Sequence, residues 1–349
     1  MAENESFEDH IWMYTEMPSS PSAVWDITFG TSCLVISLLG FVGNCLALWH
    51  FYEKNDLASR LYKHICGIDI VICSSQIPVI QAFLNGRNPG MFSNKIFCIF
   101  WKIVNEISGT LYAMAVLLLS TSRTVAIVNP LYNIKKWLVI TALYVYLLFL
   151  GLHQALTFVP GFEIGYGADS VCCYSHFNTE TVGNLTNTQS FVNTVNFVLL
   201  SIECGVPAIL TFFSFLISTT KLLFKSMIPS TQLQQLRAAI TIAIFTIVFL
   251  ICYLPTFALM VLTVYESIAL KEKFGFDQGL LSKYFIFWYA WPLCRFLLTP
   301  LNATLDFVIY TSRMKDFRNR LTQMMRKRRD KIDTVSSSKR RTMIRQLSE

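Results

Sequence analysis

Seven long apolar segments constrain the fold of this 349-residue chain more than any other feature of its sequence. An α-helix needs roughly 20 apolar residues to cross the roughly 30 Å hydrocarbon core of a bilayer. Backbone polar groups in lipid must be hydrogen-bonded within the segment itself, which favours helices. The segments cover roughly residues 26–51, 61–84, 97–128, 137–160, 190–224, 236–265 and 284–310. The sequence therefore predicts an all-α membrane protein, a seven-transmembrane helix bundle.

The composition agrees with burial in lipid. Charged residues make up 15% of the chain, against about a quarter in soluble domains. Apolar types make up 53%, and a soluble globule could not hide that much apolar surface without large exposed patches. The cysteines form no CxxC pairs, which argues against a zinc ribbon.

Lysine and arginine are unevenly distributed along the chain. The first 50 residues contain neither, whereas the connections 52–64, 129–136 and 221–237 and the tail beyond Tyr310 are basic. Cytoplasmic loops of membrane proteins are enriched in these two residues. We therefore expect a multi-pass protein of the plasma membrane, with the N-terminus outside and the C-terminus inside.

The same patterns divide the chain into four parts. These are an extracellular N-terminal segment (1–25), the seven-transmembrane bundle (26–310), a short amphipathic eighth helix on the inner leaflet (311–325) and a basic, disordered cytoplasmic tail (326–349). In the third part, apolar residues share one helical face and basic residues the other, which is typical of a helix on a lipid surface. Asn4 and Asn184 begin Asn-x-Ser/Thr sequons on the outer side and are candidate glycosylation sites.

Polar residues in the outer half of the predicted bundle could line a ligand site. Ionisable side chains within a span are costly and usually face the protein interior, and ligand sites combine apolar walls with a few polar groups. The candidate ligand-binding residues are Lys102, Asn105, Glu106, Glu203, Tyr253, Phe257, Trp291 and Arg295. Two interpretations stay open for the charged members: contact with a ligand, or structural ion pairs with one another.

A second polar group lies deeper in the predicted bundle. Asn44 and Asp69 are mid-span, and Asn302 and Asp306 share one helical face because they are four residues apart. Together they could hold water or a small cation, such as sodium near Asp69. The alternative is a hydrogen-bond network without an ion, and the large Tyr112 could fill the space an ion would need. We expect no other metal site and no cofactor.

Short motifs occur in the spans in a fixed order. They are Gly43-Asn44, Asp69, Cys98, Ser122-Arg123-Thr124, Asn129-Pro130-Leu131, Pro207, Cys252-Tyr253-Leu254-Pro255, Asn302 and Asp306-Phe307-Val308-Ile309-Tyr310. In this order and spacing, over about residues 26–325, the chain resembles a divergent, orphan-type member of the rhodopsin-like (class A) G-protein-coupled receptors. Each motif is weak alone, and their combination carries the resemblance.

The resemblance implies how such a receptor works. It implies an extracellular ligand, a peptide or a small molecule, in the outer cavity, and a heterotrimeric G protein that is activated when helix six opens. It assigns G-protein coupling to Arg123 and Leu131, and it implies a disulfide from Cys98 to Cys172 or Cys173, with Cys172 slightly favoured. It assigns switching to a polar core of Asn44, Asp69, Asn302, Asp306 and Tyr310. Membrane lipids and arrestin are further implied partners, and no nucleic acid is expected.

Three departures from the family pattern bear on switching. Ser122 replaces the acidic residue that restrains the helix-three arginine, so Arg123 is predicted to be less restrained and basal activity to be raised. Alternatively, Arg123 finds carbonyl or hydroxyl partners. Tyr253 replaces the helix-six tryptophan, and Asp306-Phe307 replaces Asn-Pro, so Pro300 is expected to bend helix seven instead.

Other functions are less compatible with the sequence. A light receptor would need a lysine for retinal on helix seven, and residues Tyr284–Tyr310 contain none. An amine receptor usually has an aspartate where Asn105 stands. The alternative from another class is a seven-helix transporter or channel, which predicts internal repeats that we do not find. We expect no enzyme, because the five histidines are scattered. The acidic outer segments favour a cationic ligand or reflect topology alone.

Overall fold

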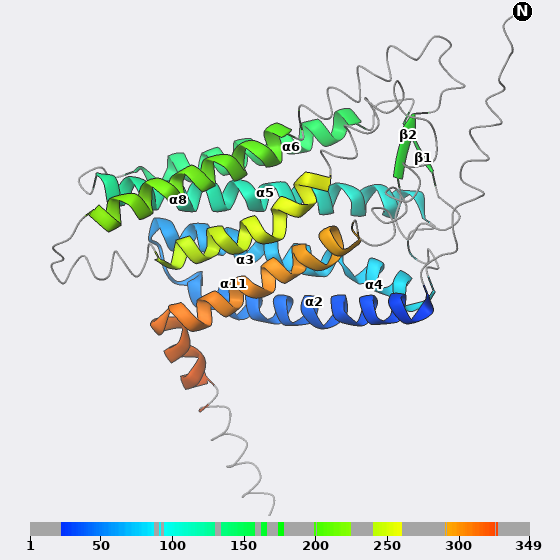
Figure 1. Ribbon diagram of the computed structural model, residues 1–349, viewed down its shortest axis with the longest axis horizontal. Coiled ribbons are helices and arrows are strands. Elements are labelled where there is room, and N and C mark those ends of the chain that lie inside the picture. The colour runs from blue at the N-terminus through cyan, green and yellow to red at the C-terminus, as the bar shows by residue number, and fades with distance from the viewer. Residues whose placement is uncertain are drawn as a thin grey trace, which may run out of the picture.

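The structure is a computed structural model in which long helices run side by side along the longest axis of the molecule (Figure 1). It describes residues 22–86, 91, 94–129, 134–157, 162–165, 174–177, 199, 201–224, 240–259, 290, 292–324 and 326.

The elements follow one another in the order of the predicted spans. They are α2 (Ala23–Tyr52), α3 (Leu57–Ser75), α4 (Ile77–Leu84), α5 (Lys95–Val128), α6 (Lys136–Thr157), β1 (Phe162–Gly165), β2 (Tyr174–Phe177), the π-helix η3 (Ser201–Gly205), α8 (Val206–Phe224), the helix Ile240–Leu259, the π-helix η5 (Leu293–Leu298) and α11 (Thr299–Arg313). The helix α2 packs on α3 and α11, and α5 packs on α3, α6 and α8. The described part is therefore nearly all helical, as predicted.

The helices have lengths and surfaces that suit a bilayer. Within the described residues, six helices are long and apolar enough to cross a membrane, and α8 contributes a shorter apolar helix, Val206–Lys221, that continues from η3. Their outward faces are apolar: Leu38 and Leu39 on α2, and Leu148 and Leu152 on α6, are each more than half exposed. Such faces are at no disadvantage in lipid, whose tails are as apolar as leucine. The chain is a multi-pass membrane protein.

Aromatic side chains form the centre of the larger hydrophobic core. It contains one buried aromatic residue from each of four helices: Phe51 on α2, Tyr62 on α3, Phe245 on the helix Ile240–Leu259 and Tyr310 on α11. The rings of Tyr62 and Tyr310 meet edge-on with their centroids 5.6 Å apart, and the Tyr310 side chain has no exposed area. Edge-to-face pairs of this kind are favourable beyond their buried area, so this core ties four helices together.

Glycines let α2 and α11 approach closely. A Cβ added at Gly43 would lie 2.3 Å from Cγ of Phe307, and one at Gly40 would lie 2.8 Å from Oγ1 of Thr304. Small residues serve the same purpose at other helix interfaces in membranes. Next to Gly43, the Asn44 side chain donates a hydrogen bond of 2.8 Å to the carbonyl oxygen of Ala303. The Gly43-Asn44 motif therefore both admits α11 and binds to it.

Three of the predicted spans are interrupted near a proline. The second span divides into α3 and α4 at Gln76, with Pro78 in the first turn of α4. The π-helices η3 and η5 each end two residues before a proline, Pro207 and Pro300. Proline lacks an N–H and crowds the preceding turn, and a π-turn is one way for a helix to absorb such a defect. The sequence analysis expected a bend at Pro300 but did not predict the interruptions at Gln76 and η3.

A short helix follows α11, although not at the predicted boundary. The helix α11 extends beyond Tyr310, and the helical segment 315–324 begins after it. Phe317 anchors this segment: it is 2% exposed, and its ring centroid lies 5.1 Å from that of His50 on α2. Arg320 also donates to Glu53 at 3.0 Å. The two contacts hold the segment against the end of α2.

The sequence analysis did not predict the hairpin of β1 and β2. The two strands pair antiparallel, with Phe162 opposite Phe177. The hairpin lies at the end of the bundle where α6 ends (Figure 1). Strands of four residues carry too little alternation to be recognised in sequence.

Candidate functional site

Three charged side chains meet between α5 and η5, and we refer to Lys102, Glu106 and Arg295 as the outer charged group. Nη2 of Arg295 lies 3.5 Å from Oε1 of Glu106, and these side chains are 15% and 28% exposed. Lys102 lies one helical turn before Glu106 on α5, and the charges of Glu106 and Arg295 both act on its ammonium. The structure thus brings together three of the predicted ligand-binding residues.

Asn105 turns from this group toward the break between α3 and α4. It is 9% exposed, and its Oδ1 accepts a hydrogen bond of 3.5 Å from the hydroxyl of Ser75. The Trp101 indole donates to the carbonyl oxygen of Ser75 at 2.6 Å. This carbonyl lies in the last turn of α3, where carbonyl oxygens have no N–H partner within the helix. Asn105 and Trp101 therefore satisfy polar groups that the interruption releases.

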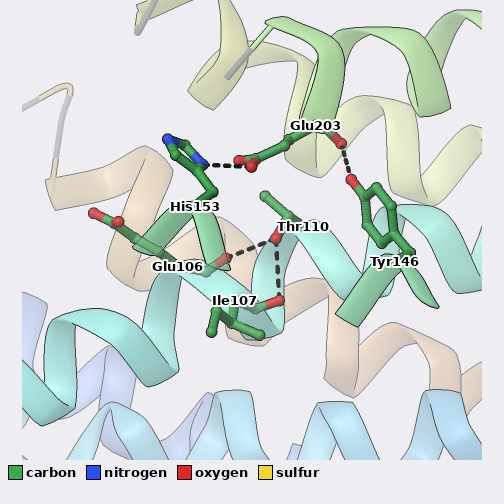
Figure 2. Close-up of polar contacts among 6 residues, drawn as sticks. All are labelled: Glu106, Ile107, Thr110, Tyr146, His153 and Glu203. Carbon is green, nitrogen blue, oxygen red and sulfur yellow. Dashed lines mark hydrogen bonds and ion pairs between the residues drawn. The ribbon is translucent and has the colours of Figure 1, made fainter. Parts of the chain in front are cut away.

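Glu203 belongs to a different cluster, formed by α6 and η3. Its Oε1 lies 2.5 Å from Nδ1 of His153, and its backbone carbonyl accepts a hydrogen bond of 2.7 Å from the Tyr146 hydroxyl (Figure 2). Glu203 and His153 are 2% and 7% exposed. In Figure 2 the Glu106 side chain points away from this pair. Whether Glu203 lines one cavity with Glu106 and Arg295 therefore stays a prediction.

His153 is a functional candidate that the sequence analysis missed. The histidines were treated as scattered, because their pairing depends on how α6 packs on η3. A usable signal existed, since an ionisable residue inside an apolar span normally has a partner in the bundle. For His153, this rule predicts a polar partner in the bundle, and in the structure that partner is Glu203.

Two of the predicted aromatic residues, Tyr253 and Phe257, lie on the helix Ile240–Leu259. The Tyr253 ring stacks on Tyr112, with centroids 5.5 Å apart and planes 2° from parallel. A Cβ at Gly109, on α5, would come within 4.0 Å of Tyr253, and one at Gly205 would come within 3.0 Å of Phe257. Tyr253 and Phe257 therefore lie against the backbones of α5 and η3. The side chain of Trp291 is outside the described residues.

The deep polar core contains the residues that the sequence analysis assigned to it. Asn44, Asp69, Asn302, Asp306 and Tyr310 all have no exposed area. The Tyr112 hydroxyl donates to Oδ2 of Asp306 at 2.6 Å. Thiol Sγ of Cys66 donates to the Tyr310 hydroxyl at 3.6 Å.

Several polar atoms of this core have no protein partner within the described residues. They are both carboxyl oxygens of Asp69, Oδ1 of Asp306, Oδ1 of Asn44 and both side-chain polar atoms of Asn302. Buried polar groups in proteins are nearly always hydrogen-bonded to protein or to ordered water, and buried waters typically bridge such atoms. The chemistry of the core therefore suits buried water. Tyr112 already occupies one position on Asp306.

Arg123 lies near the C-terminal end of α5. The hydroxyl of Ser122 donates to the carbonyl oxygen of Leu119 at 2.8 Å. Nε of Arg123 is buried and has no hydrogen-bond partner in the part of the chain that the structure describes. The positive charge of Arg123 acts on Asp56 and on Tyr62. Asp56 is therefore a candidate for a carboxylate that restrains Arg123, and the sequence analysis missed it.

Asp56 lies outside the membrane-spanning segments, between α2 and α3. Its Oδ2 accepts a hydrogen bond of 3.0 Å from the backbone N–H of Ser59, which makes it the N-cap of α3. Burial alone would raise the pKa of Asp56, but the hydrogen bonds from Ser59 and the charge of Arg123 bring this pKa below its ordinary value. The carboxylate is therefore held in its charged form near Arg123.

Thr124, where the family has a tyrosine, joins α5 to α8. Its hydroxyl lies 2.7 Å from the hydroxyl of Ser218 and 3.1 Å from the carbonyl oxygen of Ser214. These contacts fix α8 beside Arg123 at the inner end of the bundle.

Some predicted sites cannot be placed. Leu131, Cys172, Cys173, Asn4, Asn184 and the side chain of Cys98 lie outside the described residues. The disulfide and the glycosylation sites therefore stay predictions. In the described part of the chain, no three His, Cys, Asp or Glu side chains are placed to hold a metal ion.

Similar proteins were identified by sequence. Melanopsin of Podarcis siculus is 30% identical over 112 residues, which is 31% of this chain and 23% of that protein. Melanopsin-B of Xenopus laevis is 27% identical over 111 residues, which is 31% of this chain and 20% of that protein. The matched region spans less than a quarter of the length of these relatives. No protein-family model matches the chain.

The fold has a close counterpart among solved structures. Squid rhodopsin superposes with a TM-score of 0.65 and 13% sequence identity, covering 89% of this chain and 88% of that chain. At this identity the match establishes the fold, a seven-transmembrane helix bundle, and confirms that prediction. With the melanopsin matches, it confirms the resemblance to the rhodopsin-like (class A) G-protein-coupled receptors that the motifs indicate.

Proposed function

We propose that this chain is a cell-surface receptor that binds an extracellular ligand at the outer charged group and activates a heterotrimeric G protein at Arg123. Its N-terminus is outside the cell, its tail is in the cytoplasm, and its membrane is the plasma membrane. Leu131 contributes an apolar contact to the G protein. Lipids and arrestin are further partners of the inner side.

A series of contacts between helices in the interior of the bundle is the observation that carries this proposal. Tyr253 lies beside α5 at Gly109 and stacks on Tyr112 at 5.5 Å. Tyr112 binds Asp306 at 2.6 Å. Further along α11, Tyr310 packs on Tyr62 at 5.6 Å. The charge of Arg123 acts on Tyr62. Coupling between distant sites is carried by packed and hydrogen-bonded networks of this kind when they have two arrangements.

The proposed mechanism is a shift between two states of the bundle. The ligand prefers the state in which the helix Ile240–Leu259 tilts outward at its inner end, and this difference in affinity is the driving force. Tyr253 and Pro255 lie on that helix, so the stack on Tyr112 is where its movement would reach the polar core. By linkage, bound G protein raises ligand affinity by the factor with which ligand raises G-protein affinity.

A light receptor and a transporter are less well supported. The sequence has no lysine from Tyr284 to Tyr310 that could hold retinal, and Pro300 stands where that lysine is expected. A transporter would use broken helices in matching halves of a repeat. The interruptions at η3 and η5 precede single prolines in different spans and are not part of a repeat that the sequence displays.

The proposal is tested by signalling in transfected cells and by nucleotide exchange on purified G proteins. Wild type and Arg123→Ala are compared at equal surface expression, with cAMP and calcium as readouts and a ligand panel added. We expect wild type to stimulate at least one G-protein class and Arg123→Ala to lose that stimulation. Equal output from the two proteins in every readout would refute G-protein coupling through Arg123.

A further inference from the structure

Three aromatic rings from three different helices meet pairwise in the larger hydrophobic core. They are Tyr62 on α3, Phe245 on the helix Ile240–Leu259 and Tyr310 on α11, and we refer to them as the ring triangle. The centroid distances are 5.6 Å between Tyr62 and Tyr310, 5.5 Å between Phe245 and Tyr310 and 5.8 Å between Tyr62 and Phe245. Ring pairs at such distances are favourable. The triangle therefore ties the helix Ile240–Leu259 to both α3 and α11.

Phe245 lies where the proposed movement of its helix is large. It precedes Pro255 by ten residues, which is about 15 Å at the helical rise per residue. Helices bend at proline, and a tilt of roughly 10° at Pro255 would move Phe245 by roughly 3 Å over this length. A gap of roughly 1 Å already forfeits up to about half of a dispersion contact. The ring triangle therefore belongs to the state in which this helix is not tilted.

A hydrogen bond also fixes the hydroxyl end of Tyr310. Sγ of Cys66 on α3 donates to the Tyr310 hydroxyl at 3.6 Å, and neither side chain has any exposed area. In the part of the chain that the structure describes, neither side chain forms another hydrogen bond. Cys66 follows Tyr62 by four residues, so both side chains lie on the same face of α3. The helix α3 therefore holds Tyr310 at two points, the ring through Tyr62 and the hydroxyl through Cys66.

We propose that Cys66 is a positioning residue for the switch: its thiol holds Tyr310 in the ring triangle and so favours the untilted state of the helix Ile240–Leu259. The inference rests on the proposed function, since it concerns the tilt of that helix. Having no exposed area, Cys66 acts through Tyr310 and not by contact with a ligand or a partner protein. A thiol is a weak hydrogen-bond donor, so its removal should shift the balance of the two states by about two- to fivefold.

The first test measures opening of the core in purified full-length receptor without G protein. N-ethylmaleimide is added, and modification of Cys66 and Cys73 is followed by mass spectrometry of their peptides. Both thiols are on α3 and are 0% and 2% exposed, so each reacts only when its surroundings open. Tyr310→Phe removes the acceptor, and Phe245→Leu removes one ring of the triangle. In both variants Cys66 should react about two- to fivefold faster than in wild type, and Cys73 should react at the wild-type rate.

The second test measures G-protein activation without ligand at equal surface expression. Cys66→Ala should raise this basal signal about two- to fivefold. In the Tyr310→Phe background, which already lacks the acceptor, the same change should have no effect, because the bond can be lost only once. Cys73→Ala is the matched control. It removes a buried thiol from the same helix, one with no hydrogen bond to Tyr310 among the described residues, and should signal like wild type.

Three results would overturn the inference. They are equal reaction rates of Cys66 in wild type and Tyr310→Phe, an equal acceleration at Cys73, which would indicate general loosening, and an effect of Cys66→Ala that persists in the Tyr310→Phe background. The first test contains no G protein. If Tyr310→Phe exposes Cys66 as expected and the receptor activates no G protein, the proposed function is refuted and the role of Cys66 stands. If Cys66 reacts equally and signalling still depends on Arg123, only this inference is refuted.

Discussion

The hydroxyl of Tyr112 donates a hydrogen bond of 2.6 Å to Oδ2 of Asp306 and so joins α5 to α11 in the interior of the bundle. Both side chains have no exposed area. Tyr112→Phe keeps the ring and removes the hydroxyl donor. The buried Oδ2 of Asp306 then loses this hydrogen bond. We expect the free energy of unfolding to fall by about 1–3 kcal/mol, measured by thermal unfolding of purified receptor.

Tyr144→Phe is the matched control for this change. Tyr144 is 54% exposed on α6, so losing its hydroxyl should have little effect. If both variants lose the same stability, the bond between Tyr112 and Asp306 contributes nothing specific to the fold.

The close contact of α2 with α11 makes a second prediction. A methyl group at Gly43 would lie 2.3 Å from Cγ of the Phe307 ring, and overpacking of this kind costs roughly 1–3 kcal/mol. We expect Gly43→Ala to lower the Tm and surface expression. Combining it with Phe307→Ala should recover part of the loss, because the second change removes the clashing ring.

Gly67→Ala provides the comparison on α3. Nothing lies within 4 Å of a Cβ at Gly67, and alanine is favoured over glycine inside a helix by roughly 0.5–1 kcal/mol. This variant should be as stable as wild type or more so. A Gly43→Ala protein as stable as Gly67→Ala would contradict the close approach.

The pair of His153 and Glu203 makes a third prediction. Removing one partner of a buried polar pair typically costs about 3–5 kcal/mol, because the other partner stays buried without it. His153→Leu and Glu203→Leu should therefore each destabilise the receptor strongly. The double variant should lose clearly less than the sum of the two, since no unpaired group remains. Additive losses in a double-mutant cycle of unfolding free energies would show that the 2.5 Å contact is not an energetic coupling.

The spans and their buried polar residues could be predicted because the bilayer imposes a length and a polarity on each helix. Asp69, Asn302 and Asp306 stand out in an apolar stretch for that reason. Contacts between helices could not be predicted in the same way. His153 and Glu203 are 50 residues apart, and their contact depends on where the π-turn of η3 directs the Glu203 side chain.

Local interruptions also escaped prediction, because periodicity averages over several turns. The division of the second span at Gln76 shifts the positions of neighbouring side chains by a fraction of a turn. Asp56 was passed over since it lies in a polar connection, where a carboxylate is unremarkable. Its cap on α3 is a local contact, whereas the effect of the Arg123 charge on Asp56 depends on the packing of α3 against α5.

A fourth prediction concerns the pH dependence of stability. The pKa of Asp56 lies below its ordinary value in the folded receptor, so the carboxylate stabilises the folded state fully above its unfolded pKa of about 3.9. This contribution is lost as the pH falls through the depressed folded-state pKa. The difference in Tm between wild type and Asp56→Asn should therefore shrink as the pH is lowered toward about 3. A Tm difference between the two proteins that grows on acidification would contradict this prediction.

The final prediction separates the two roles of Asp56. Asparagine caps helices about as well as aspartate, so Asp56→Asn keeps the bond to Ser59 while removing the negative charge that faces Arg123. Since Ser122 supplies no acid beside Arg123, the loss of Asp56 should free the arginine and raise signalling without ligand. Asp56→Ala should do the same and also lose about 0.5–2 kcal/mol of stability with the cap.

The measurement is ligand-free G-protein activation at equal surface expression, and Glu53→Gln is the matched control. Glu53 is also an inner-side carboxylate, but it is 71% exposed and pairs with Arg320. Neutralising it changes the net charge equally and leaves the surroundings of Arg123 intact. Basal signalling should therefore rise in Asp56→Asn and stay at the wild-type level in Glu53→Gln. Equal signalling in all three proteins would mean that Arg123 is restrained by something other than the Asp56 charge.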